Sequence, residues 1–140
     1  MSEPYVKRLW GANTEVVSNP VNCGDADISS SHSGHLTFAK VTASGDVRLA
    51  VDHSATLILD ELECKSLTVD VSYASTLRIG KLTCKGQVTV NVSYSSLFVV
   101  DGGNVDSTTG IVNYSSTGNF YAKIAKNDGV VAQNSSTWLT

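Results

Sequence analysis

A short Ser-rich motif returns every 20 or 21 residues along this chain of 140 residues, without a gap. Its six copies are His32-Ser33-Gly34, His53-Ser54-Ala55, Tyr73-Ala74-Ser75, Tyr94-Ser95-Ser96, Tyr114-Ser115-Ser116 and Asn134-Ser135-Ser136. A period of this size is typical of a stacked solenoid, because one repeat cannot bury its own apolar face and needs its neighbours to do so. The repeat therefore predicts one elongated domain.

Apolar and polar residues alternate on both sides of the motif, which is the pattern of strands with one buried face. After the motif, the aligned apolar columns are Leu36, Leu57, Leu77, Phe98, Gly118 and Trp138, then Phe38, Leu59, Ile79, Val100, Phe120 and Thr140. Before it they are Val47-Leu49-Val51, Leu67-Val69-Val71 and Val88-Val90-Val92. Together they predict an all-β fold, a small single-stranded parallel β-helix of about five turns, each adding about 4.8 Å.

Further columns predict a third side and in-register stacking. Val41, Leu62 and Leu82, followed by Ala43, Cys64 and Cys84, indicate a third short side or bend. Lys40, Glu61 and Lys81 alternate in sign, as neighbours one strand spacing apart should. After Val100 the match weakens, so we expect a wider turn at residues 101–104 and a register change or bulge beyond it.

The two ends of the predicted β-helix differ in sequence. Residues 1–24 precede the first recognisable turn and form a predicted N-terminal capping and docking segment, with Tyr5, Leu9 and Trp10 as docking candidates; residues 25–140 form the β-helix domain. Near the other end, Trp138 and Leu139 fall inside a turn. We expect that end to be closed by a partner, another copy or a fold-back of these residues, because an open sheet edge is a template for further pairing.

Composition argues against several function classes. The formal charge is −3 with no basic run, so nucleic-acid binding is not expected. No window has the length and hydropathy of a membrane span, and the first residues lack the apolar core of a signal peptide, which predicts synthesis in the cytoplasm and no membrane association. Three cysteines do not form a disulfide framework.

The motif's first residues form a column of rings: His32, His53, Tyr73, Tyr94 and Tyr114, followed by Asn134. Counting alternate residues from Val51 through the motif to Leu57 places these rings inward, lining a corner with their hydroxyls on turn backbone. The alternative is a flat outward strip that binds a sugar or a protein partner.

Two residue groups could carry other chemistry. Cys23, Asp25, Asp27, His32 and His35 include a His-x-x-His spacing, but no second Cys or His pair is close, so we expect turn capping by the Asp residues and neither metal nor cofactor. Cys64 and Cys84, one turn apart, are expected to be buried free thiols, with a bridge on oxidation as the alternative.

No catalytic arrangement follows from the sequence. Asp52-His53-Ser54 has the residue types of a triad, but consecutive strand residues should point to alternating faces. Polysaccharide-acting enzymes need carboxylates grouped on one outer face. Asp52, Asp60 and Asp70 would have to share one cleft for that chemistry, so we predict that the protein is not an enzyme.

Several apolar residues are predicted to point outward. Ile58, Leu97 and Val99, with Trp138 and Leu139 near the chain end, form a candidate interaction surface, because a contiguous exposed apolar patch marks a binding site. Scattered exposed apolar residues are the alternative. Outward threonines at seven positions suggest ice binding, yet Ile58 and Leu97 interrupt their ranks.

One repeat resembles a known family. The segment Tyr73-Ala74-Ser75-Thr76-Leu77-Arg78-Ile79 is similar to the short β-helical repeats of the auto-transporter adhesin head domain, also called the GIN domain, over roughly residues 32–120. The resemblance implies a β-helical fold and a non-catalytic role. Members of that family resemble exported, surface-attached modules, whereas this sequence shows no signal peptide.

These observations predict a non-enzymatic structural or binding module that docks on, caps or decorates a larger assembly, such as a phage particle or an injection-like machine. A homotrimer is the favoured state, because three prisms can bury their outward apolar columns against one another. The alternative is a cytoplasmic inhibitor or immunity protein. Adhesin-like carbohydrate binding and ice binding are minor alternatives.

Overall fold

A computed structural model describes residues 4–140 and contains thirteen strands in one sheet. The strands are β1 (Tyr5–Trp10), β2 (Thr14–Val17), β3 (Val21–Cys23), β4 (Ala26–Ser31), β5 (His35–Ala43), β6 (Asp46–Asp52), β7 (Thr56–Cys64), β8 (Ser66–Val71), β9 (Thr76–Val92), β10 (Leu97–Val112), β11 (Thr117–Phe120), β12 (Lys123–Ala132) and β13 (Thr137–Leu139). The described residues include no helix that is long and apolar enough to span a membrane.

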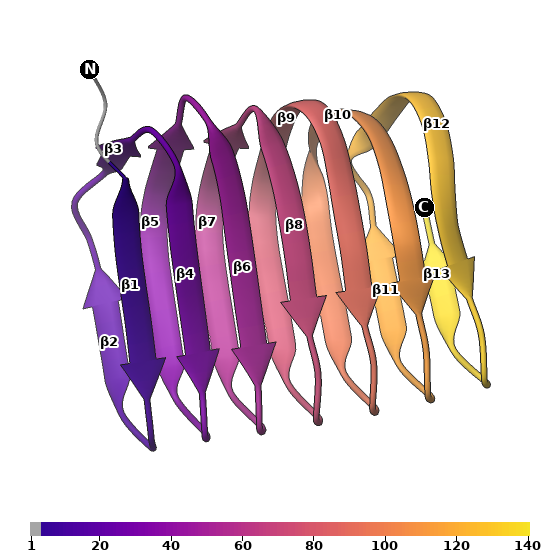
Figure 1. Ribbon diagram of the computed structural model, residues 1–140, viewed down its shortest axis with the longest axis horizontal. Helices are drawn as coiled ribbons and strands as arrows, with labels where there is room; N and C mark the ends of the chain where they lie inside the picture. The colour runs from indigo at the N-terminus through magenta and orange to yellow at the C-terminus, as the bar shows by residue number, and fades with distance from the viewer. Residues whose placement is uncertain (1–3) are drawn as a thin grey trace.

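Every strand pairs in parallel with the strand one lap away, so the chain is a parallel β-solenoid. One face runs from β1 through β4, β6 and β8 into the second halves of β9 and β10 and then β12. The other runs from β2 and β3 through β5, β7 and the first halves of β9 and β10 to β11 and β13. Figure 1 shows the two faces as a front and a back row of strands. The predicted fold class is confirmed.

The solenoid has about seven laps, against the five expected. The difference comes mainly from the N-terminal segment, because β1 pairs with β4 and β2 with β5. Its corner reads Trp10-Gly11, with Gly11 at a φ of 82°, and so lacks the Ser-rich motif that identified the other laps.

The core consists of the predicted apolar columns, stacked in register. Leu36, Leu57, Leu77 and Phe98 follow one another across four laps and are each fully buried. Because each lap covers the apolar face of the next, the burial that stabilises one lap depends on its neighbours.

Charged side chains occupy inward positions in the first lap. Lys7 pairs with Ile28 and Glu15 with Leu36, so both lie in columns that are apolar elsewhere, and they form an ion pair with each other. This end of the apolar core is therefore covered by a polar pair.

In the last lap, the Trp138 ring packs 5.4 Å from Phe120 and 6.5 Å from Phe98, centroid to centroid. Gly118 makes this possible, because a Cβ there would lie 2.5 Å from the indole. The Trp138 Nε1 donates a hydrogen bond to Asp128. The fold-back predicted as one way to close this end is not what the structure contains, because β13 continues the parallel stack on β11. The inward side chain of Trp138, rather than a reversal of the chain, lies over Phe120 and Phe98.

The register irregularity lies where a bulge was expected, but the predicted wide turn is wrong. Residues 101–104 continue β10, with Gly102 opposite Lys81 and Gly103 opposite Leu82. Gly103 has a φ of 121°, and its missing side chain admits the Leu82 carbonyl. The register shifts between Val105 and Ser107, because the preceding lap has one extra residue at that bend.

The charge column is in register as predicted. Lys40 lies opposite Glu61, and Glu61 lies opposite Lys81. The Lys40 Nζ is 3.7 Å from Glu61 Oε2, which is an exposed ion pair with a small effect on stability.

Candidate functional site

The Ser-rich corner turns through two successive residues in the left-handed backbone region. At the second motif, φ is 53° for His53 and 63° for Ser54, and the other motifs repeat these values within a few degrees. Each such non-glycine residue costs about 1–2 kcal/mol. Hydrogen bonds between neighbouring corners offset part of this cost, as from the Ser54 N–H to the Tyr73 carbonyl at 2.9 Å.

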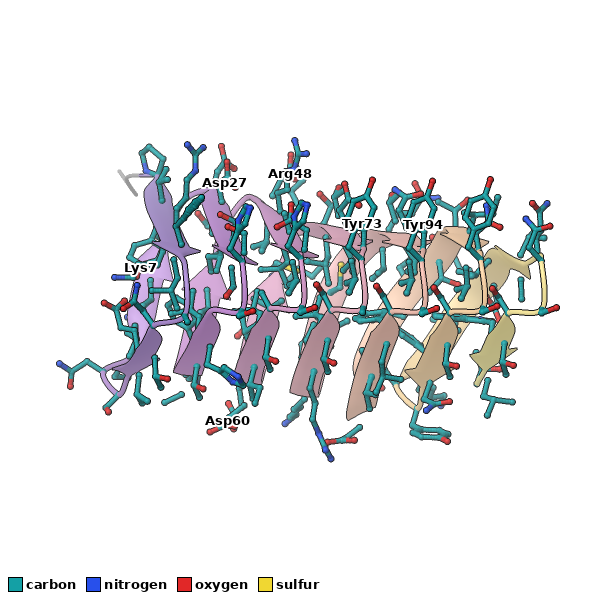
Figure 2. The ribbon with its side chains drawn as sticks, turned by 90° about the horizontal axis from the view of Figure 1, so that it is seen from below. Lys7, Asp27, Arg48, Asp60, Tyr73 and Tyr94 are labelled. Carbon is teal, nitrogen blue, oxygen red and sulfur yellow. The ribbon has the colours of Figure 1, made fainter. Side chains whose placement is uncertain are left out.

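The ring column lies on the outside, so the prediction that it faces inward is wrong. Tyr73, Tyr94 and Tyr114 are 50%, 46% and 48% exposed. Strict alternation holds only for extended backbone, and the two left-handed residues place both His53 and Ser54 outside before Ala55 returns to the core. Figure 2 shows Tyr73 and Tyr94 as neighbours pointing the same way.

The rings form one continuous stack. The ring centroids of Tyr73 and Tyr94 are 4.9 Å apart with planes 1° from parallel, and those of Tyr94 and Tyr114 are 4.8 Å apart. The stack continues through His53 and His32 to Trp10, whose ring centroid is 4.0 Å from that of His32.

This geometry determines which groups of the ring column are exposed to a binding partner. The ring faces cover one another, so the exposed parts are ring edges, phenol hydroxyls and imidazole nitrogens. Sugar binding by stacking needs a free ring face, which the inner members of the stack do not present. The ring column is better suited to hydrogen bonding and to metal ligation than to stacking against a ligand.

The inner side of the corner carries a row of serine hydroxyls that the sequence analysis did not assign. Ser75 Oγ accepts a hydrogen bond from the Ala55 N–H, Ser96 Oγ from the Ser75 N–H, and Ser116 Oγ from the Ser96 N–H. These serines are buried, so each hydroxyl satisfies a backbone donor that water does not reach. The row could have been predicted from the sequence, because Ser recurs at the third position of the motif.

His32, Asp52 and His53 form the densest group of ligand-type side chains in the described residues. One ligand atom from each lies within 4.8 Å of the other two. The imidazole centroids are 4.6 Å apart with planes 6° from parallel, and His53 Nδ1 is 3.3 Å from Asp52 Oδ1. The expectation that neighbouring Asp52 and His53 point to opposite faces is therefore wrong, again because the corner is left-handed.

The residues first considered for metal binding are dispersed. Cys23 is buried at a different bend, and His35 is exposed beyond the corner. Asp25 Oδ1 accepts a hydrogen bond of 2.9 Å from the Asp46 N–H one lap away, so this carboxylate links two laps rather than capping its own turn as predicted. Asp27 lies 3.4 Å from the Arg8 guanidinium.

The bend that carries Cys23, Cys64 and Cys84, called the cysteine bend below, lies at the far end of the lap from the Ser-rich corner. That corner, with its column of rings, is called the ring corner. A hollow of about 650 Å³ opens over the cysteine bend, with Cys23, Cys64, Lys65, Glu63 and Lys85 in its lining. All three thiols are free and buried, as expected for Cys64 and Cys84. A hydrogen bond with Cys84, together with burial, raises the pKa of the Cys64 thiol well above its usual range, and the same hydrogen bond lowers that of Cys84.

Four of the five predicted interaction residues lie on one lateral face, and Trp138 does not. Ile58, Leu97 and Val99 are half-buried outward residues of the β5–β7–β9–β10 face, and Leu139 is 48% exposed on the same face. Arg78 separates Ile58 from Val99 in their column. Trp138 lies in an inward column.

In the first lap, Tyr5 and Leu9 pack partly against the core, and Trp10 is 54% exposed. Of the three docking candidates, Trp10 therefore presents the largest exposed aromatic surface.

The acidic residues that an enzyme would need in one cleft are not brought together. Asp52 and Asp70 lie on β6 and β8, on the face that carries Arg48. Figure 2 shows Asp60 on the opposite side of the solenoid from Arg48.

Comparison with protein-family models, curated proteins and solved structures found no match to this chain. The resemblance to the GIN domain therefore stays a prediction, and the function is argued from the chain's own geometry.

Proposed function

We propose that this chain is a non-enzymatic structural module that decorates a larger protein assembly, such as a phage particle or an injection-like machine, and docks through one lateral face. The single observation that carries the proposal is the strip formed by Leu97 and Val99, with Ile58 and Leu139 nearby. These outward apolar side chains lie on a flat, in-register sheet face.

The surroundings of this strip support the proposal. Arg78 forms an ion pair with Asp101 at 3.0 Å beside Val99, so the apolar strip has a charged margin. An apolar centre with a polar rim is the usual composition of a protein interface. The inward positions of the end laps carry charge at Lys7, Glu15 and Asp128, which makes the lateral faces the better docking surfaces.

We propose a homotrimer as the docking state, because three copies can bury these strips against one another in a closed symmetric arrangement. Light scattering of the isolated chain tests this. The wild type should have three times the mass of one chain, and the double variant Leu97→Asp, Val99→Asp should be a monomer with an unchanged circular dichroism spectrum. Thr68→Asp, an outward change on the opposite face, is the matched control and should stay trimeric. A monomeric wild type at high concentration would contradict the trimer.

The docking itself is tested by copurification. A decoration protein should purify with particles in a fixed symmetric copy number, and the Leu97→Asp, Val99→Asp variant should be lost from them. A stoichiometric complex with one soluble partner would instead overturn this proposal in favour of an inhibitor or immunity protein.

A further inference from the structure

Two histidines and one aspartate from adjacent laps converge at the N-terminal half of the ring stack. His32 follows β4, and Asp52 and His53 lie at the end of β6, one strand spacing away. Their ligand atoms lie within 4.8 Å of one another, and His53 Nδ1 is 3.3 Å from Asp52 Oδ1. His32 and His53 are exposed, and Asp52 is half-buried, so the group can be reached from solvent.

The backbone holds the two imidazoles together. Both histidines have a φ of 53°, and the Ser33 N–H donates a hydrogen bond of 2.9 Å to the His53 carbonyl. The rings leave the two corners in the same direction as a result. Trp10 packs on the outer side of His32 and Tyr73 on the outer side of His53, which restricts how far either ring can swing away.

A second observation concerns Asp52. Its Oδ1 is shielded from solvent and accepts no hydrogen bond among the described residues, and its 3.3 Å contact with His53 Nδ1 is an ion pair only when that imidazole is protonated. A shielded carboxylate oxygen without a partner is costly, and a cation is the partner that relieves the cost most fully. Aligned positions in other laps hold Ser31, Ser72, Ser93 and Asn113, so the acid occurs only in a lap that also carries a histidine at the corner.

We propose that His32, Asp52 and His53 form a binding site for a divalent transition-metal ion, with Zn²⁺ as the ion that best fits two imidazoles and one carboxylate. Imidazole nitrogen favours Zn²⁺, Cu²⁺ and Ni²⁺ over Mg²⁺ and Ca²⁺. Three protein ligands leave a coordination position open to water or to a group from a partner.

Binding should change the ring stack measurably. Donor atoms around a tetrahedral ion with bonds of about 2.0–2.1 Å lie roughly 3.3 Å apart, closer than the spacing of the stacked imidazoles. The two rings must therefore tilt toward each other. This predicts shifted imidazole resonances for His32 and His53, and a change in the fluorescence of Trp10, which contacts His32.

Isothermal titration calorimetry with ZnCl₂ on the reduced full chain tests the site. We expect one ion per chain, and a loss of affinity of at least about tenfold in His53→Tyr and in Asp52→Ser. Both substitutions install the residue that other laps carry at the same position, so the corner should keep its fold. His35→Ala and Cys64→Ala are the matched controls and should bind like the wild type.

Nuclear magnetic resonance of the wild type gives a second readout that needs no variant. Zn²⁺ should shift the His32 and His53 signals and leave those of His35 unchanged. The proposal is overturned if the wild type does not bind Zn²⁺ below millimolar concentration. It is also overturned if His53→Tyr folds and binds normally, or if the shifts map to His35 or to the cysteine bend.

Discussion

The ring corner and the cysteine bend are two turns of the same solenoid that obtain their stability in different ways. At the ring corner every copy of the motif uses two left-handed residues, five of the six copies carry an outer ring, and four carry an inner serine. At the cysteine bend the number of residues varies: two residues separate Cys64 from Leu67, and three separate Cys84 from Val88. The ring corner has a fixed backbone and can be recognised in the sequence by its motif. The cysteine bend accepts a bulge and can be recognised only by its apolar column.

The largest contrast between the two turns should come from deleting one residue at each. Deletion of Ser95 at the ring corner shifts Leu97 and Phe98 to the wrong faces, so we expect loss of cooperative folding. Deletion of Gly86 at the cysteine bend gives that lap the length of its neighbours and should cost below about 2 kcal/mol. Urea unfolding followed by circular dichroism measures both. Equal effects would contradict the difference between the turns.

The inner serines should matter more than the serines of the cysteine bend. Ser96→Ala leaves the buried Ser75 N–H without its acceptor, and we expect a loss of about 1–3 kcal/mol in the free energy of unfolding. Ser66→Ala removes an exposed hydrogen bond to Asp46 and should cost within about 0.5 kcal/mol. The denaturant midpoints of the two variants, at a constant slope of the free energy of unfolding against denaturant concentration, measure this difference. An equal loss of stability in Ser66→Ala and Ser96→Ala would contradict it.

The outer rings should contribute by stacking rather than by their hydroxyls. Tyr94 stacks on both Tyr73 and Tyr114, so Tyr94→Ala should destabilise the fold by about 1 kcal/mol. Tyr94→Phe keeps both stacked contacts and should leave the unfolding midpoint unchanged. A Phe variant as unstable as the Ala variant would show that the hydroxyl, not the stack, stabilises this corner.

The cysteine bend should add a small alkaline instability. Burial, and then the neighbouring Asp25 carboxylate, raise the pKa of the Cys23 thiol above its ordinary 9.0. The unfolded chain then loses this proton at lower pH than the folded chain, so stability is retained below about pH 9 and falls as the pH rises through that value. Between pH 8 and pH 10 the wild type should lose more stability than Cys23→Ala. Parallel pH profiles for the two proteins would rule this out.

Sequence reasoning found what depends on period and alternation. The stacked columns Leu57–Leu77–Phe98 and Lys40–Glu61–Lys81 follow from the repeat alone, since residues one period apart must be neighbours in a solenoid. The first lap was not predicted, because its corner is Trp10-Gly11 and lacks the Ser-rich motif. Gly11 adopts a φ of 82° there, which glycine can do at little cost.

The candidate metal site could not be found by the same reasoning. Alternation through the corner placed His53 inside and separated it from Asp52, whereas two consecutive left-handed residues bring both outside. The register that aligns His32 with His53 was already in the sequence. What was missing was the backbone conformation of the corner, which serine, histidine and tyrosine do not specify as glycine or asparagine would.

The most direct test of the solenoid is a set of distances between outward residues of one column. Val6, Asp27, Arg48 and Thr109 belong to one in-register column. Val6 lies five strand spacings from Thr109, Asp27 lies four and Arg48 lies three. In a chain with its cysteines replaced by alanine, spin labels paired with one at Thr109 should give electron–electron distances of about 24, 19 and 14 Å. Equal steps of about 5 Å are the predicted result. Distances that do not increase from Arg48 to Asp27 to Val6 would contradict in-register stacking of the laps.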